Sequence, residues 1–424
     1  MINIVHRVFC KLLHLLKRDC YPSEDIIIRL YEDRKEDAIL KRIREKDVIN
    51  VAFFCMSVSL WKYETLFIRM QKDSHFNPLF FISPKMDVWS ARIHEIDLMR
   101  AYCKKMGFQY IEMDNYFFNK GVDLQQYSID LAFYTQPYIN IPCPEYYYDK
   151  LVDNALLCYV PYGYLISRMK HNYVSLLNII AWKNFFPTTI SKKIALTFKP
   201  DYDNILDLGY PGYDMYLSCE EYNWGKRGTK KVIWAPHYSV GEGNWIQLSS
   251  FMSIKDYMLS LAEEFKDEIS VAFKPHPYLF PTLCSKWGKK KAIAYFREWQ
   301  HRDNCILFEG SAYSLFKSSD AMIHDCASFL LDYMYTQKPC LYVSMTGKLN
   351  VETGEDGRDA YDAHYHAKNL NEIHDFIKQV VLESNDPMIV NRLEVLNKHI
   401  VKPGEDTSTE RLFMNIKESL GVSE

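Results

Sequence analysis

Short apolar runs alternate with longer amphipathic stretches from about residue 47 onward. This alternation predicts parallel strands joined by crossover helices. Leu60 to Lys72 and Trp89 to Met106 carry apolar residues at helical spacing. The strands expected around these helices are Val48 to Ser57, Asn77 to Ile82, Gln109 to Met113, Ile129 to Tyr134 and Leu156 to Val160. Together these elements predict one doubly wound α/β domain.

A second series of the same kind follows the stretch Leu165 to Phe185, which we expect to be helical. Helices are expected at Ile254 to Phe265 and Ser328 to Thr336, and only helices from Leu370 onward. The expected strands are Asn204 to Leu208, Lys231 to Ala235, Ile269 to Phe273, Cys305 to Phe308, Ala321 to His324 and Cys340 to Val343. Two doubly wound Rossmann-like domains facing each other across a cleft constitute the GT-B fold, which we predict here.

The pattern also predicts where the chain divides. We expect an N-terminal helical segment at 1–46, an N-terminal Rossmann-like domain for the acceptor at 47–190, and a C-terminal Rossmann-like domain for a nucleotide donor at 191–424. A length of 424 residues agrees with two domains, because single cores stop growing at about 250–300 residues.

Residues 2–18 combine apolar positions at helical spacing with basic residues. The apolar positions are Ile4, Val5, Val8, Phe9, Leu12, Leu15 and Leu16, and the basic ones are Arg7, Lys11, Lys17 and Arg18. Such a helix can lie in a membrane interface, and the alternative is a helix packed on its own domain. Because no run reaches the ~18 apolar residues of a membrane span, we expect a cytoplasmic protein peripheral to the inner membrane face.

Composition narrows the classes of ligand. A net charge of −3 gives no basic field for nucleic acid, so no such partner is expected. Eleven Cys without a Cys-x-x-Cys pair indicate a reducing compartment and argue against a zinc site. His364 and His366 lie near Asp359 and Asp362, but we interpret this cluster as solvated surface. No Gly-x-Gly-x-x-Gly or Walker loop is present, and we expect neither a cofactor nor a metal.

Polar residues follow several strands of the second series, where sheets of this type bind ligands. Lys274 and His276 stand in a turn stiffened by two prolines, and a cation beside an imidazole suits a diphosphate. Ser328 and Asp332 lie one helical turn apart after the strand that ends near Asp325, where backbone N–H groups can hold phosphate and a carboxylate can accept from ribose. The alternatives are a proline-rich strand exit and ordinary helix caps.

Two further segments complete the candidate donor site. His237 follows a strand and precedes a glycine-containing loop, and an imidazole titrates near working pH. Gly209 and Pro211 belong to a tight turn whose glycines permit close approach of the backbone. We therefore predict donor contacts from Gly209 and Pro211, as well as from the residues after the other strands.

The order and spacing of these segments resemble those of the CDP-glycerol glycerophosphotransferase family, which includes teichoic-acid polymerases and capsule relatives. The resemblance covers roughly residues 200–420 and is most specific over 205–345. The matching motifs are Gly209-Tyr210-Pro211-Gly212-Tyr213-Asp214, Ala235-Pro236-His237, Lys274-Pro275-His276-Pro277, and Ser319-Asp320 with Ile323, Asp325, Ser328, Asp332 and Lys338-Pro339. The resemblance implies a functional histidine at His276.

The sequence departs from the family pattern at three places, and the last two matter for function. Gly212 replaces an Arg, Ala327 replaces the first Ser of a Ser-Ser pair, and the N-terminal His-Gly motif has only Tyr162-Gly163 as its nearest counterpart. That His supplies a proposed catalytic base in the family. We therefore expect His237 or a cleft residue of the N-terminal domain to act as the base, and Tyr162 is a candidate.

The resemblance implies a transferase that moves glycerol phosphate, or a similar unit, from a CDP-linked donor to a hydroxyl. The acceptor would be a lipid-linked or polymeric molecule of the cell envelope, and CMP would leave. Two alternatives stay open: transfer of a sugar from a nucleotide sugar in the same cleft, and a catalytically inactive module that binds polymer.

Overall fold

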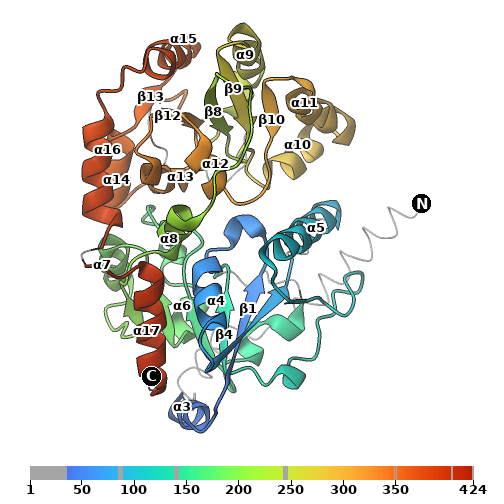
Figure 1. Ribbon diagram of the computed structural model, residues 1–424, viewed down its shortest axis with the longest axis vertical. Helices are drawn as coiled ribbons and strands as arrows, with labels where there is room; N and C mark the ends of the chain where they lie inside the picture. Colours follow the sequence, from blue (N-terminus) through green and yellow to red (C-terminus); the bar gives the residue numbers. More distant parts are fainter. Residues whose placement is uncertain are drawn as a thin grey trace.

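The computed structural model describes residues 36–422, apart from 85–88, 138–142, 242–246, 348, 350 and 403. Two parallel sheets, each with helices packed around it, lie one above the other in Figure 1. The two doubly wound α/β units that the sequence predicts are therefore present. The amphipathic stretch at residues 2–18 lies outside the described residues.

The first sheet has seven parallel strands in the order β3-β2-β1-β4-β5-β6-β7, which extends a Rossmann order by one strand. Its central strand β1 is a nearly continuous apolar run because helices cover both faces of the sheet. The strands are β1 (Ile49–Cys55), β2 (Phe76–Ile82), β3 (Tyr110–Ile111), β4 (Leu131–Tyr134), β5 (Leu156–Tyr159), β6 (Lys183–Phe185) and β7 (Ile205–Leu206).

The second sheet has six parallel strands in the order β10-β9-β8-β11-β12-β13, with the same topology as the first. The strand order reverses between β8 and β11, and open sheets bind ligands at the carboxyl ends beside such a switch point. The strands are β8 (Lys230–Ala235), β9 (Ile269–Phe273), β10 (Cys305–Leu307), β11 (Ala321–His324), β12 (Cys340–Val343) and β13 (Tyr365–Ala367).

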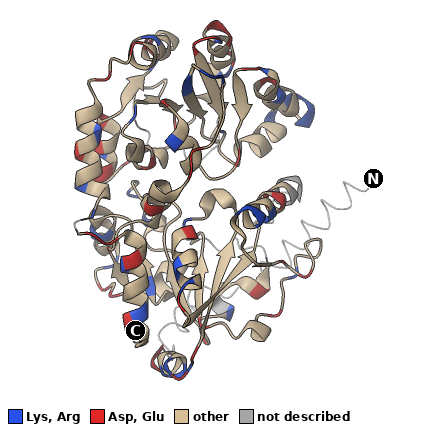
Figure 2. Ribbon diagram, viewed as in Figure 1, with Lys and Arg blue, Asp and Glu red and all other residues tan. Residues whose placement is uncertain are grey.

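Helices connect the strands and place most charged residues on the outside, where Lys and Arg intermingle with Asp and Glu in Figure 2. None of the described helices is long and apolar enough to cross a membrane. The helices are α3 (Glu36–Arg44), α4 (Glu64–Gln71), α5 (Trp89–Met106), α6 (Leu176–Ile180), α7 (Thr189–Phe198), α8 (Pro211–Ser218), α9 (Phe251–Glu264), α10 (Leu279–Trp287), α11 (Lys289–His301), α12 (Tyr313–Ser318), α13 (Phe329–Asp332), α14 (Glu355–Asp362), α15 (Leu370–Asp375), α16 (Ile389–Val395) and α17 (Ser408–Leu420).

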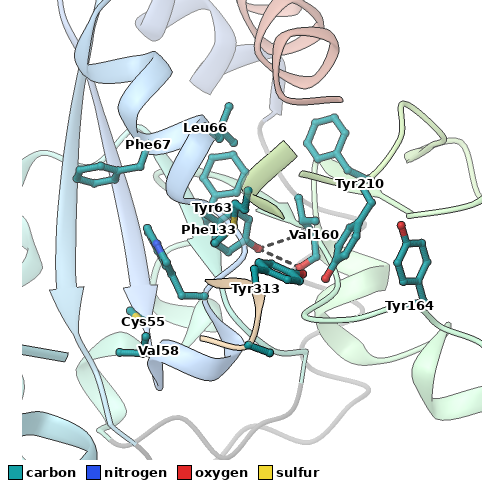
Figure 3. Close-up of a cluster of buried hydrophobic side chains, with 14 of the residues drawn as sticks. Cys55, Val58, Tyr63, Leu66, Phe67, Phe133, Val160, Tyr164, Tyr210 and Tyr313 are labelled. Atoms are coloured by element: carbon teal, nitrogen blue, oxygen red, sulfur yellow. Dashed lines mark hydrogen bonds between the residues drawn. The ribbon is translucent and has the colours of Figure 1, made fainter. Parts of the chain in front are cut away.

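Buried tyrosines join the two α/β units into one core (Figure 3). Tyr63, from the first unit, donates its hydroxyl proton toward the carbonyls of Tyr134 and Val160 at 2.7 and 3.1 Å. Tyr210 and Tyr313 belong to the same cluster, and Tyr313 stands on α12 of the second unit. The contact between the units is thus largely apolar with a few internal hydrogen bonds, which favours a fixed relative position.

The last helix, α17, returns to the first unit and packs on α4 (Figure 1). Arg69 donates two hydrogen bonds to Glu410 at 2.8 and 3.1 Å, and Lys417 lies 2.9 Å from Asp73. Residues near the C-terminus therefore stabilise the N-terminal unit. The division at residue 190 stays a prediction about folding units.

Two expectations about elements are wrong. Asn204 to Leu208 does not begin the second sheet, because β7 pairs with β6 at the edge of the first. Leu165 to Phe185 is not one helix: the capping box of Ser175 and Asn178 starts α6 only at Leu176, and the chain then forms β6. The free edge of β5 accounts for this difference. Without β6, the backbone N–H and C=O groups along that edge would have no strand to pair with, and β6 provides these partners.

Candidate active site

A cavity of about 470 Å³ lies between the carboxyl ends of the two sheets. Ser57 and Gln136 line it from the loops after β1 and β4, whereas His237, His276 and Ser328 line it from the second unit. This volume is within the range of about 300–1,000 Å³ typical of small-molecule sites. The predicted interdomain site thus contains the two histidines and Ser328 together.

His237 is held by the turn that follows β8. Its backbone N–H donates to Asp325 Oδ1 at 2.5 Å, and its ring Nδ1 accepts the backbone N–H of Ser239 at 3.2 Å. Because a backbone N–H can only donate, the neutral ring carries its proton on Nε2. Burial lowers the pKa of His237 to about 4, so the ring is neutral near pH 7 and offers an N–H donor to the cavity it lines.

His276 has the same arrangement after β9. Its Nδ1 accepts the backbone N–H of Tyr278 at 3.1 Å, and the backbone N–H of His276 donates to the carbonyl of Pro236 at 3.1 Å. Burial, then the neighbouring His237 and Lys274, hold the pKa of His276 well below 6.5. The rings of His276 and His237 lie 5.1 Å apart between centroids. Two neutral imidazoles thus offer neighbouring Nε2–H donors to one cavity.

Lys274 is not part of the cavity lining, but it is near enough to act electrostatically on His276. It is buried, and its ammonium donates to the carbonyl of Gly310 at 3.3 Å. Burial is the main cause that lowers the pKa of Lys274 to about 8, and the charge of Lys62 adds to the effect. Positive charge from Lys274 therefore reaches the histidines through a medium of low dielectric constant, where it is screened weakly.

Asp325 is buried and accepts backbone hydrogen bonds from His237 and Ser250, the latter at 2.7 Å. Burial raises its pKa to about 7. Within the described chain it is not part of the cavity lining. Its contacts fix the loop that carries His237, so it positions that residue rather than touching the cavity.

Ser328 and Asp332, predicted as one face of a helix, have separate environments. Ser328 lines the cavity, but α13 is only four residues long. Asp332 is buried between the units, where Tyr335 donates to it at 3.5 Å. Burial raises the pKa of Asp332 to about 6, and the buried Lys62 acts against this rise. Asp332 therefore stands against the first unit and not in the lining.

The turn with Gly209 and Pro211 lies away from the cavity lining described here. Gly209 has φ +93°, and a Cβ there would lie 2.3 Å from Ser408 Oγ. Pro211 begins α8, and Asp214 in that helix accepts the backbone N–H groups of Ser408 and Thr409. This turn secures the start of α17.

Tyr162 and Gly163 do line the cavity from the first unit, as does a carboxylate that the sequence did not reveal. Glu95 stands on α5, and its Oε2 is buried without a hydrogen-bond partner among the described residues. Burial raises the pKa of Glu95, while a hydrogen bond from Ser57 opposes the rise. In the sequence, Glu95 is one of many charged residues of an amphipathic helix, so no local signal distinguishes it.

The acidic and histidine-rich stretch at 359–366 does not form one cluster. Asp359 bonds Lys398 and His399, each at 2.7–2.8 Å, whereas His366 is exposed. His364 is only 1% exposed, so interpreting it as solvated surface is wrong. Its ring Nδ1 donates to the carbonyl of Ala360 at 2.6 Å.

Two Rossmann-type units whose carboxyl ends face one cavity define a GT-B protein, the class to which several nucleotide-dependent enzymes belong. The chain belongs to the CDP-Glycerol:Poly(glycerophosphate) glycerophosphotransferase family, whose profile matches residues 183–416, more than half of the sequence. It is therefore a CDP-glycerol glycerophosphotransferase-like enzyme.

Solved structures agree on the fold. A variant of the wall teichoic acid polymerase TagF matches with a TM-score of 0.57 and 12% identity over 99% of this chain and 98% of its own, and a TagF structure soaked with CDPG matches equally well. The S. aureus MnaA–UDP structure has a TM-score of 0.57 and 12% identity over 89% of this chain and 98% of its own. A putative UDP-N-acetylglucosamine 2-epimerase from Listeria monocytogenes has a TM-score of 0.59 and 12% identity over 88% and 97%. A sequence search of curated proteins found no match.

Proposed function

We propose that the cavity binds the diphosphate of CDP-glycerol against His237 and His276, and that the acceptor hydroxyl enters from the first unit. The observation that carries this proposal is the pair of neutral imidazoles, each with Nδ1 occupied by a backbone N–H and Nε2–H left as a donor. Two such donors, with the buried charge of Lys274 nearby, suit phosphoryl oxygens on which negative charge grows.

In the proposed reaction, the acceptor oxygen attacks the phosphorus that bears glycerol, in line with the bridging oxygen. The new P–O bond forms as the bond to the bridging oxygen breaks, and CMP departs with that oxygen. The histidine donors stabilise the charge that moves onto CMP. They are poor general bases in this state, because their depressed pKa values leave little driving force for taking up a proton.

We assign the base to Glu95 and not to His237 or Tyr162. Its carboxylate belongs to the first unit, lines the same cavity and has a raised pKa because of burial. A raised pKa strengthens a carboxylate as a proton acceptor near neutral pH. The acceptor proton would pass to Glu95, which would later release it to water.

The test is release of CMP from CDP-glycerol by the purified full chain, with and without a poly(glycerol phosphate) primer. Primer-dependent CMP release is the expected result. Turnover of a nucleotide sugar instead would replace the donor, and primer binding without turnover of any donor would indicate an inactive polymer-binding module. Glu95→Asp serves as the conservative control beside Glu95→Gln, since it keeps the carboxylate.

We further propose that the acceptor is lipid-linked and that residues 2–18 attach the protein to the inner membrane face. The basic amphipathic pattern of that stretch supports this proposal. Flotation of the full chain with anionic vesicles should exceed that of a chain starting at Asp25. Equal flotation would mean that the stretch has a structural role.

A further inference from the structure

Three metal-ligating side chains converge inside the second unit, away from the cavity. They are His324 at the end of β11, Cys340 at the start of β12 and His364 just before β13. Their ligand atoms all lie within 4.8 Å of one another, and the three residues are at most 1% exposed. The parallel register pairs Met322 with Cys340 and thereby places Cys340 on the same face of the sheet as His324.

In both imidazoles, Nε2 is the nitrogen that is left to take part in this cluster. His324 Nδ1 lies 3.0 Å from the carbonyl of Cys326, and His364 Nδ1 lies 2.6 Å from the carbonyl of Ala360. A carbonyl can only accept, so each Nδ1 carries the proton and each Nε2 has a free lone pair. Neither Nε2 has a hydrogen-bond partner among the described residues, although both atoms are buried.

Hydrogen bonding alone cannot satisfy this cluster. The thiol of Cys340 has one proton and can donate it to one Nε2 at most, which leaves the other buried acceptor unpaired. A metal ion, in contrast, accepts a lone pair from each of the three atoms. Histidines whose second nitrogen donates to a backbone carbonyl are the usual arrangement around bound metals, because that bond fixes the tautomer and the ring orientation.

We propose that His324, Cys340 and His364 bind one thiophilic d¹⁰ cation, Zn²⁺ or Cu⁺. Two imidazoles and a thiolate form a donor set that both ions accept. Ligands at bond lengths of about 2.0–2.3 Å stand about 3.5 Å apart, so the three atoms need to approach by about 1 Å. Such a site would tie together three neighbouring strands of the donor unit.

The two ions differ in charge. A thiolate with Cu⁺ is neutral, whereas a thiolate with Zn²⁺ keeps one positive charge. The nearby guanidinium of Arg392 is buried but paired with Asp386, so the choice between the two ions is left to the experiment.

The experiment measures metal bound to the full chain after incubation with Zn²⁺ alone, or with Cu⁺ under anaerobic reducing conditions, followed by desalting. One equivalent of either ion per chain is expected, and the ion retained identifies the occupant. Cys340→Ser and His364→Gln should each lose that equivalent. The matched controls are Cys305→Ser, which changes a buried thiol of β10, and His374→Gln, which changes a half-buried imidazole of α15. Both should keep the equivalent.

X-ray absorption of the wild-type chain at the edge of the bound metal requires no variant and guards against misfolding. One sulfur and two imidazole nitrogens in the first coordination sphere are expected. The proposal is overturned if neither ion is retained at one equivalent, if the two control variants lose it as readily, or if the coordination sphere lacks nitrogen.

Discussion

Replacing His276 with Asn or with Gln separates the roles of its two ring nitrogens. Asn places its carbonyl oxygen near the position of Nδ1 and can still accept the Tyr278 N–H, which the wild-type ring accepts at 3.1 Å. Gln places its amide nitrogen near the position of Nε2 and can still donate to the cavity, but it loses the short acceptor. The proposed mechanism needs the Nε2–H donor, and the fold needs the Nδ1 acceptor.

The two losses have different magnitudes. Removing one donor from the site where charge develops costs about 10²–10³-fold in kcat, or about 3–4 kcal/mol of transition-state stabilisation. Leaving the Tyr278 N–H unpaired costs about 1 kcal/mol of unfolding free energy, because that residue is only half-buried and water can replace part of the bond. His276→Asn should therefore be nearly inactive with a near-native Tm, and His276→Gln should melt earlier with more activity.

The assay follows CMP release at saturating CDP-glycerol, with Tm measured on the same samples. Since the pKa of His276 is well below 6.5, its ring is already neutral, and the rate loss should be uniform from about pH 6 to 8. His374→Asn, which changes a half-buried histidine on α15, is the control for a general effect of the substitution. Turnover by His276→Asn above about 10% of wild type, or equal activity of the two variants, would refute the assigned role.

Three other predictions test the surroundings of the site. Glu95→Gln should lower kcat by about 10²–10⁴-fold and abolish the acidic limb of the pH–rate profile. In wild type that limb should lie above the usual pH range of a glutamate, because burial raises the pKa of Glu95. An unchanged pH–rate profile in the variant would exclude Glu95 as the base. Asp325→Asn should cost about 1–3 kcal/mol of unfolding free energy in urea titrations near pH 4, since the amide nitrogen that replaces one carboxyl oxygen cannot accept the backbone N–H bonded at that position. As pH rises through the folded pKa of about 7 this cost should shrink, because the carboxyl of wild type is protonated more readily in the folded chain and wild type therefore loses stability there. Gly209→Ala should lower Tm through about 1–3 kcal/mol of backbone strain at φ +93° and a clash with Ser408, and an unaltered Tm would contradict that packing.

The sequence alone determined the strands and the turns directly after them. β9 is a buried apolar run, and Pro275 and Pro277 stiffen its exit, so the positions of Lys274 and His276 follow from local pattern and backbone restriction. The same reasoning located His237 after β8 and Ser328 after β11. Because the carboxyl ends of parallel strands meet at one edge of a sheet, the sequence also indicated that these residues lie together.

Contacts between segments distant in sequence were decided only by the tertiary structure. Asp332 has the helical spacing of a ribose ligand, but the first unit covers it and brings Lys62 near, which no local pattern specifies. Glu95 lines the cavity because α5 packs against the turn Val58–Leu60 that follows β1. Likewise, β7 joins the first sheet because β6 has a free edge. His364 lies forty residues from His324, and only the pairing of β11, β12 and β13 brings the two side chains within reach of one another. The physical reason is that the burial of a strand's side chains depends on which strands become its neighbours in the sheet, and not on the adjacent residues in the chain.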